Sequence, residues 1–139
     1  MQENHTENRT HKFRAWMTEK CGGVPHMISW ERLVELKALD ELFESANLGR
    51  HILMQFTGLT DKNNSLIYEG DIVEARTLRR IKPKKIYSDW RTFIVYWADW
   101  NKAFRLGYPI NGIKDDESMA NYDEYKILGS IYSDPELLK

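Results

Sequence analysis

Short stretches of this chain alternate apolar and polar residues, and such alternation predicts β-strands that bury one face. Glycine, proline, asparagine or acidic residues separate most of the stretches. The segments for which we expect strands are KFRAWM (12–17), ILMQFT (52–57), LIY (66–68), DIVEAR (71–76), RTFIVYW (91–97), KAFRLGY (102–108) and YKILGSIY (125–132). A mainly β protein is therefore predicted.

One segment follows a different period. From Trp30 to Ala46, apolar side chains recur every three or four positions, a spacing that places them on one face of an α-helix. Ser29 is expected to cap the first turn, and Gly49 to end the helix after about five turns. The predicted fold class is mainly β on the α+β margin: a small antiparallel sheet or partly open barrel, with one amphipathic helix inserted near residues 29–48.

Composition indicates how the chain is organised and in which compartment it is found. Residues 1–11 contain no apolar residue after Met1, so we expect a flexible N-terminal segment and then a single domain over residues 12–139. The lone Cys21 excludes an internal disulfide and suits a reducing cytoplasm. No apolar run is long enough for a bilayer and no signal-peptide segment is seen, so a cytoplasmic protein without a membrane partner is predicted.

The segment QFTGLTDKNNSLIYEGDIVEA (55–75) crowds acidic and amide side chains between apolar runs. A calcium loop that begins at Asp61 would need glycine at its sixth position and glutamate at its twelfth, where this chain has Leu66 and Ile72. Turn chemistry explains the same side chains through bonds to nearby amides and left-handed backbone. The residues to which we assign this structural role are Asp61, Asn63, Asn64, Gly70 and Asp71.

Catalytic signals are weak. Glu69 and Asp71 flank Gly70 and form a candidate acid–base pair, but residues two apart around a tight turn more often point to solvent. Cys21 and the histidines lack zinc-binding spacing, and the chain has no glycine-rich phosphate loop. We predict a protein that is not an enzyme, with no catalytic residue, cofactor, metal or small-molecule substrate. A small hydrolase or metal enzyme is the last alternative.

A basic run, RTLRRIKPKK (76–85), contains no acid, and tryptophans follow it, although the formal net charge of the chain is -1. Cations that neutralise phosphates and aromatic rings that stack on bases are typical of single-stranded nucleic-acid binding. Two other roles are open: a solvated hairpin tip that protects an edge strand, and pairing with the acidic residues Asp115, Asp116, Glu117, Asp123 and Glu124 of a neighbouring subunit. The candidate contacts with nucleic acid or a partner are Arg76, Arg79, Arg80, Lys82, Lys84, Lys85, Trp90, Trp97 and Trp100.

Self-association is predicted from apolar surface. The helix expected at residues 29–48 has a wide apolar face, residues 91–97 are apolar on both faces, and the chain has five tryptophans. Aromatic residues are enriched in subunit interfaces. We therefore expect a homo-oligomer.

Three stretches resemble the YopX-like family of small phage and prophage proteins: KFRAWM, LMQFTGLTDKNNSLIYEGDIV and ILGSIYSDPELL, in the expected order. The central stretch is the specific one. Met17 replaces a usual acidic residue, and Asn64 replaces a hairpin glycine, whose left-handed position asparagine can adopt. The resemblance implies a mostly β, homo-oligomeric, intracellular phage-type protein. The family has no established activity, so no catalytic residue carries over.

The preferred hypothesis is a non-enzymatic, oligomeric binding module, an accessory protein of phage or prophage type. The first alternative is a nucleic-acid-binding protein that uses the basic run 76–85 and the neighbouring aromatic residues.

Overall fold

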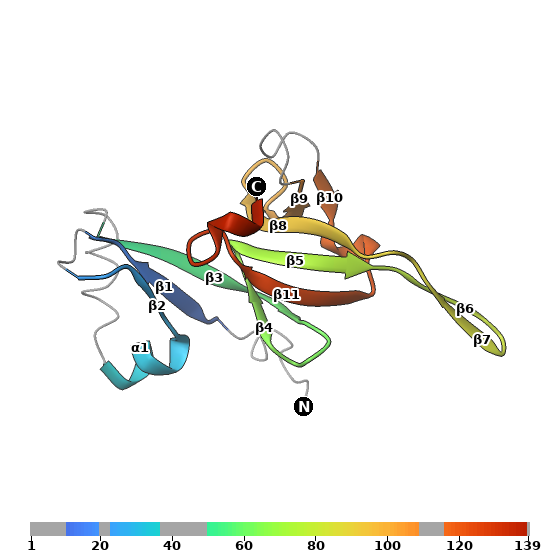
Figure 1. Ribbon diagram of the computed structural model, residues 1–139, viewed down its shortest axis with the longest axis horizontal. Coiled ribbons are helices and arrows are strands. Elements are labelled where there is room, and N and C mark those ends of the chain that lie inside the picture. The colour runs from blue at the N-terminus through green and yellow to red at the C-terminus, as the bar shows by residue number, and fades with distance from the viewer. Residues whose placement is uncertain (1–10, 20–22, 37–49, 109–115, 139) are drawn as a thin grey trace, which may run out of the picture. The chain divides into compact units, whose positions relative to one another are not determined.

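The computed structural model describes residues 11–19, 23–36, 50–108 and 116–138. They form mostly antiparallel strands, which include a half-barrel, together with one α-helix (Figure 1). The predicted fold class is confirmed. Among the described residues, no helix is long and apolar enough to span a bilayer.

The chain divides into two compact units, Met1–Gly58 and Leu59–Lys139. The single domain expected over residues 12–139 stays a prediction. The expected flexible segment 1–11 lies outside the described residues, except for His11.

The first unit is built on a short antiparallel sheet. Its elements are β1 (Phe13–Met17), β2 (His26–Ile28), α1 (Trp30–Leu36) and β3 (His51–Thr60), which continues past Gly58 into the second unit. β1 pairs with both other strands, so that Ala15 lies opposite Ile28 on one side and Leu53 on the other. Ala15 and Leu33 are buried, and Ile28 and Leu53 pack against them. A small core thus joins the helix to the sheet.

The helix begins where its sequence predicts. The Ser29 hydroxyl accepts a hydrogen bond from the backbone N–H of Arg32 at 3.3 Å, which satisfies one of the unpaired amides of the first turn. The described part of the helix ends at Leu36, and the rest of the expected helix and its stop at Gly49 lie outside the described residues. β2 was not predicted, because three residues after Pro25 are too few to show a period and only pairing with β1 defines them as a strand.

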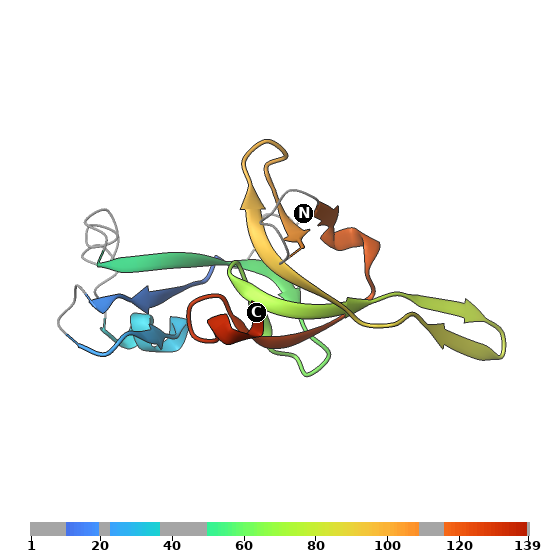
Figure 2. The same ribbon diagram turned by 45° about the horizontal axis from the view of Figure 1, so that its top comes forward.

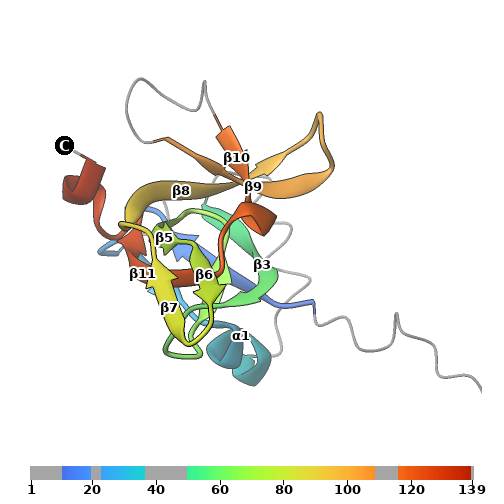
Figure 3. The same cartoon turned by 90° about the vertical axis from the view of Figure 1, so that its right-hand side faces the viewer.

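The second unit contains a larger antiparallel sheet with the strand order β10-β9-β8-β5-β11. Its strands are β5 (Asp71–Arg76), β8 (Arg91–Ala98), β9 (Ala103–Gly107), β10 (Asp116–Ser118) and β11 (Glu124–Ser130). β4 (Leu66–Tyr68) follows β3 in the other sheet. Figure 3 shows β10, β9 and β8 above β5 and β11, as this strand order requires.

The core of the second unit follows the alternation of its strands. Val73 and Ala75 of β5 are fully buried, and so are Phe93 and Val95 of β8. The other buried members of this core are Ile67, Leu106, Met119 and Tyr125. These side chains alternate along β5 and β8 and so share one face of the sheet, while Ile72, on the other face of β5, is also fully buried.

The acidic stretch that follows β9 contains two short elements. Asp116–Ser118 form β10, which pairs with β9, and Met119–Asn121 form the 3-10 helix η3. The Ser118 hydroxyl caps η3 by accepting the Ala120 N–H, and Met119 is buried. Sequence alternation did not predict β10, because this strand is polar and only three residues long.

The chain ends in a short compact motif. β11 has an irregularity between Ile127 and Gly129, and the 3-10 helix η4 (Pro135–Leu138) follows. Between them the Asp134 carboxylate accepts hydrogen bonds from the Ser130 N–H at 3.1 Å and the Ser133 hydroxyl at 2.7 Å.

Candidate nucleic-acid interface

Asp61 is bonded to backbone amides on two sides. Its Oδ1 accepts the N–H groups of Asn63 (2.9 Å) and Ser65 (3.0 Å), and its Oδ2 accepts that of Ile127 (3.2 Å) on β11. Asn64 has a φ of 65°, the left-handed conformation that asparagine tolerates. Burial raises the pKa of the Asp61 carboxyl, but the bonds from Ser65, Ile127 and Asn63 outweigh it, so the pKa is lowered. Asp61 is therefore a carboxylate with a structural role, which is to hold the turn and β11 through these hydrogen bonds.

Asp71 does not point to solvent. It is 1% exposed, and its Oδ2 accepts the Tyr68 N–H at 2.8 Å. Gly70 adopts a φ of 87° and donates its N–H to the Val95 carbonyl at 2.8 Å. Asp71 thus bonds a backbone amide within the turn that Gly70 forms.

The basic run forms a hairpin that leaves the main sheet. β6 (Leu78–Ile81) and β7 (Lys84–Tyr87) pair antiparallel around the turn Lys82-Pro83, whose peptide bond is cis. We call residues 78–87 the ribbon. It continues from the ends of β5 and β8 and projects beyond them (Figures 1 and 2). Within the second unit, the ribbon forms a sheet of its own.

Five cations of the ribbon are exposed: Arg79, Arg80, Lys82, Lys84 and Lys85. Within the described part of the chain, no carboxylate pairs with any of them. Arg80 lies opposite Lys85, and Arg79 lies opposite Ile86. Side chains of successive residues in a strand point to opposite faces, so each face of the ribbon has two of the strand cations.

Arg76 and Trp90, two other predicted contact residues, lie against each other at the base of the ribbon. The Arg76 guanidinium lies 3.9 Å from the Tyr87 ring centroid and 4.3 Å from that of Trp90. Its Nε and Nη2 donate to Glu124 Oε2 at 2.8 and 2.7 Å. We call these four residues the base clamp. Arg76 and Trp90 are thus engaged within the chain.

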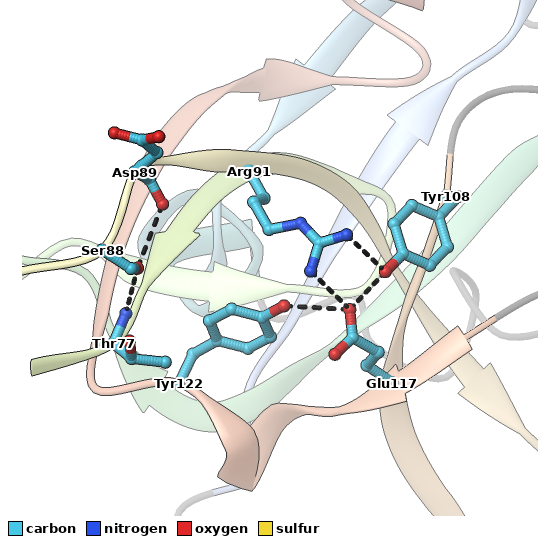
Figure 4. A network of polar contacts seen from close by, with 7 residues as sticks. All are labelled: Thr77, Ser88, Asp89, Arg91, Tyr108, Glu117 and Tyr122. Atoms are coloured by element: carbon cyan, nitrogen blue, oxygen red, sulfur yellow. Dashed lines mark hydrogen bonds and ion pairs between the residues drawn. The ribbon is translucent and has the colours of Figure 1, made fainter.

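Backbone bonds complete the base of the ribbon. The Asp123 carboxylate accepts the Leu78 N–H at 2.7 Å, and the Ser88 hydroxyl accepts the Thr77 N–H at 2.9 Å (Figure 4). The Ser88 N–H donates to the Thr77 carbonyl at 3.0 Å. These bonds and the base clamp fix the direction in which the ribbon leaves the sheet.

Trp97 and Trp100 lie at the other end of β8. Trp97 packs edge-on against Phe104, with ring centroids 5.0 Å apart. Trp100 is 70% exposed, and the Arg105 guanidinium lies 5.1 Å from its ring centroid. Trp97 lies six positions after Arg91 in β8, about 20 Å along a strand. The structure therefore does not bring these two tryptophans together with the cations of the ribbon.

A polar network that the sequence did not reveal lies beside the base of the ribbon (Figure 4). Glu117 accepts hydrogen bonds from the hydroxyls of Tyr108 and Tyr122, and Arg91 lies 3.8 Å from the same carboxylate oxygen. The bond from Tyr108 lowers the pKa of Glu117, and burial together with Glu117 raises the pKa of Tyr122 to about 12. The carboxylate thus stays ionised and the phenol stays protonated at neutral pH, which suits a structural network.

The acidic residues proposed to meet the basic run of a neighbour are engaged within the chain. Asp116 bonds to Tyr96 and Arg105, Glu117 to the network around Arg91, and Glu124 to Arg76. Asp115 lies outside the described residues. These acids do not neutralise the exposed cations of the ribbon.

A pocket of about 340 Å³ lies in the second unit. The side chains that line it are Leu59, Thr60, Met119, Ala120, Tyr122, Asp123 and Tyr125. The carboxylate of Asp123 is already bonded to the ribbon, and burial raises the pKa of the Tyr125 hydroxyl. Among the described residues, no three histidine, cysteine or acidic side chains are placed to hold a metal ion.

Fold and site together define a small antiparallel β protein with a projecting cationic ribbon. The chain belongs to the YopX family, whose model, described as YopX protein, matches residues 12–139. The search of the curated proteins finds no match. The crystal structure of protein EF1440 from Enterococcus faecalis is 20% identical, covers 94% of this chain and 99% of that chain, and has a TM-score of 0.47.

Proposed function

We propose that this protein is a non-enzymatic binding module that binds nucleic acid through the ribbon. The observation that carries the proposal is the set of five exposed cations, without a paired acid in the described residues, on a hairpin that projects from the sheet. Such a surface neutralises phosphates, and release of their counterions drives binding.

The cations of the ribbon are not explained by a contribution to the stability of the hairpin. Arg80 and Lys85 lie directly opposite each other across the strands, and like charges in that position destabilise an antiparallel pair. Lysines also protect strand edges from pairing with other chains, but that role does not require two cations to face each other. A polyanionic ligand removes the repulsion, so the arrangement favours binding.

Acidic residues at the base of the ribbon would limit where phosphates bind. Asp123 and Glu124 lie at this base through their bonds to Leu78 and Arg76, and Asp89 follows the ribbon in the chain. Phosphates are repelled by carboxylates. Binding is therefore expected on the outer part of the ribbon.

Fluorescence anisotropy with labelled DNA across a salt series tests the proposal. In Lys84→Gln/Lys85→Gln, the slope of log K against log salt should fall in magnitude by about 1.8, because each phosphate contact contributes about 0.9. The control Lys102→Asn/Lys126→Gln removes the same charge at exposed positions outside the ribbon and should leave the slope unchanged. Absence of binding at low salt, or equal losses in both variants, would show the proposal to be wrong.

Self-association is a second part of the proposal. Trp97 and Trp100 expose aromatic surface at the turn between β8 and β9, and exposed aromatic side chains are typical anchors of interfaces. Membership of the YopX family supports an accessory protein of phage or prophage type that acts in the host cytoplasm.

A further inference from the structure

We infer that the ribbon enters the major groove of double-stranded DNA tip first, so that its two faces meet the two phosphate backbones and Ile81, next to the tip, contacts thymine methyl groups. This inference rests on the proposed function, because it names the ligand class and the mode of binding at the same ribbon.

The distribution of charge supports entry between two phosphate backbones. Arg80 and Lys85 occupy one face of the ribbon, Arg79 and Lys84 occupy the other, and Lys82 lies at the tip. A protein that binds phosphates on one side needs cations on one face only. Cations on both faces are suited to a groove, where phosphates line both walls.

The dimensions of the ribbon fit B-form DNA. Its strands are paired over four positions, which corresponds to about 13 Å of length. The major groove is about 12 Å wide and about 8.5 Å deep and admits a two-stranded ribbon, so the half of the ribbon nearer the tip fits within its depth. The major groove of A-form RNA is too narrow for side chains to read the bases, and the single-strand alternative lacks Trp97 and Trp100 beside the cations. Duplex DNA is therefore the preferred ligand.

One isoleucine next to the tip provides an apolar contact. Ile81 is 56% exposed and lies in the strand pair nearest the turn, on the face that holds Arg79 and Lys84. The thymine methyl group is the apolar feature that the major groove presents to such side chains. Burial of Ile81 against it would remove apolar surface from water.

The test compares two duplexes of identical sequence, one with thymine and one with deoxyuridine in its place, at one salt concentration. Replacement of thymine removes methyl groups and keeps every phosphate. For the natural chain, affinity should fall about fourfold for each methyl group contacted. Ile81→Ser should bind both duplexes equally. The control Leu137→Ser changes an exposed apolar side chain outside the ribbon and should keep the natural discrimination.

The outcomes separate the two proposals. Duplex binding that does not respond to thymine methyl groups, or that a minor-groove ligand displaces, overturns the groove assignment while nucleic-acid binding stands. Tighter binding to single-stranded DNA or to duplex RNA overturns the inference in the same way. Absence of binding to every nucleic acid overturns both.

Discussion

Asp61 joins two parts of the second unit through one carboxylate. One oxygen holds the turn at Asn63 and Ser65, and the other accepts the amide of Ile127, a residue far along the chain. Asparagine in this position has one accepting oxygen, and its second group is a donor. The bond to Ile127 or the bonds within the turn must then be lost.

Asp61→Asn should therefore lower the free energy of unfolding at pH 7 by about 1–3 kcal/mol, the cost of leaving a buried amide without an acceptor. The pKa of Asp61 is lowered in the folded state, so its contribution is complete above the unfolded pKa of about 3.9 and is lost as the pH falls through the lower folded pKa. The difference from the natural chain should shrink below about pH 4.

Urea unfolding between pH 7 and pH 3 measures this difference. Asn63→Ser is the matched control, because Asn63 uses its backbone N–H in the turn, and its small offset should not change with pH. A difference between Asp61→Asn and the natural chain that stays constant down to pH 3 would contradict the role of the ionised carboxylate.

Gly129 lies where a side chain has no room. A Cβ built on it would come within 2.7 Å of the Cγ and 2.9 Å of the Cβ of Asp134. Asp134 cannot move away freely because it accepts hydrogen bonds from Ser130 and Ser133.

Gly129→Ala should therefore lower the free energy of unfolding by about 1–3 kcal/mol, the usual cost of overpacking. Gly23→Ala should change it little, since nothing lies within 4 Å of the Cβ position at Gly23. Thermal and urea unfolding of the two variants check the prediction. Equal stability of both would mean that the segment around Asp134 adapts without cost.

At the scale of elements, the base clamp connects the ribbon to the sheet. Trp90→Ala removes one of the two rings beside the Arg76 guanidinium, and such contacts contribute about 0.5–2 kcal/mol. The amides of Thr77 and Leu78 should exchange with deuterium faster, because local opening at the ribbon base becomes easier.

Hydrogen exchange followed by mass spectrometry or NMR measures this effect. Trp100→Ala is the control, since Trp100 lies at the opposite end of β8, and it should leave the exchange at the ribbon base unchanged. Trp90→Phe should restore part of the protection. If Trp90→Ala leaves exchange at Thr77 and Leu78 unaltered, the clamp does not hold the ribbon.

Alternation in the sequence predicted most strands of the fold, because one buried face imposes a period of two on segments such as β5 and β8. It missed β2 and β10, which are three residues long and are defined by their partners β1 and β9. The cations of the ribbon were recognised as a group. That Arg76 stacks on Trp90, and that Glu117 binds two tyrosines, depends on how strands and turns come together, for which local patterns contain no signal.

At the scale of the whole molecule, we expect self-association. Light scattering at micromolar concentration should give a mass that is a multiple of 16.5 kDa, and Trp97→Ser/Trp100→Ser should shift it toward the monomer, because exposed aromatic anchors contribute much of the energy of an interface. Lys102→Asn, in the same turn, is the control. A strictly monomeric mass for the natural chain would contradict the prediction.

The ribbon also makes the charge of the molecule uneven. The chain has 20 basic and 21 acidic residues. Without the five cations of the ribbon, the chain has 15 basic and 21 acidic residues, which gives a formal net charge of -6. A polyanion therefore attracts the molecule in the orientation that presents the ribbon and repels it in others. Such a molecule would not coat DNA indiscriminately. Each productive encounter would begin with the tip of one hairpin.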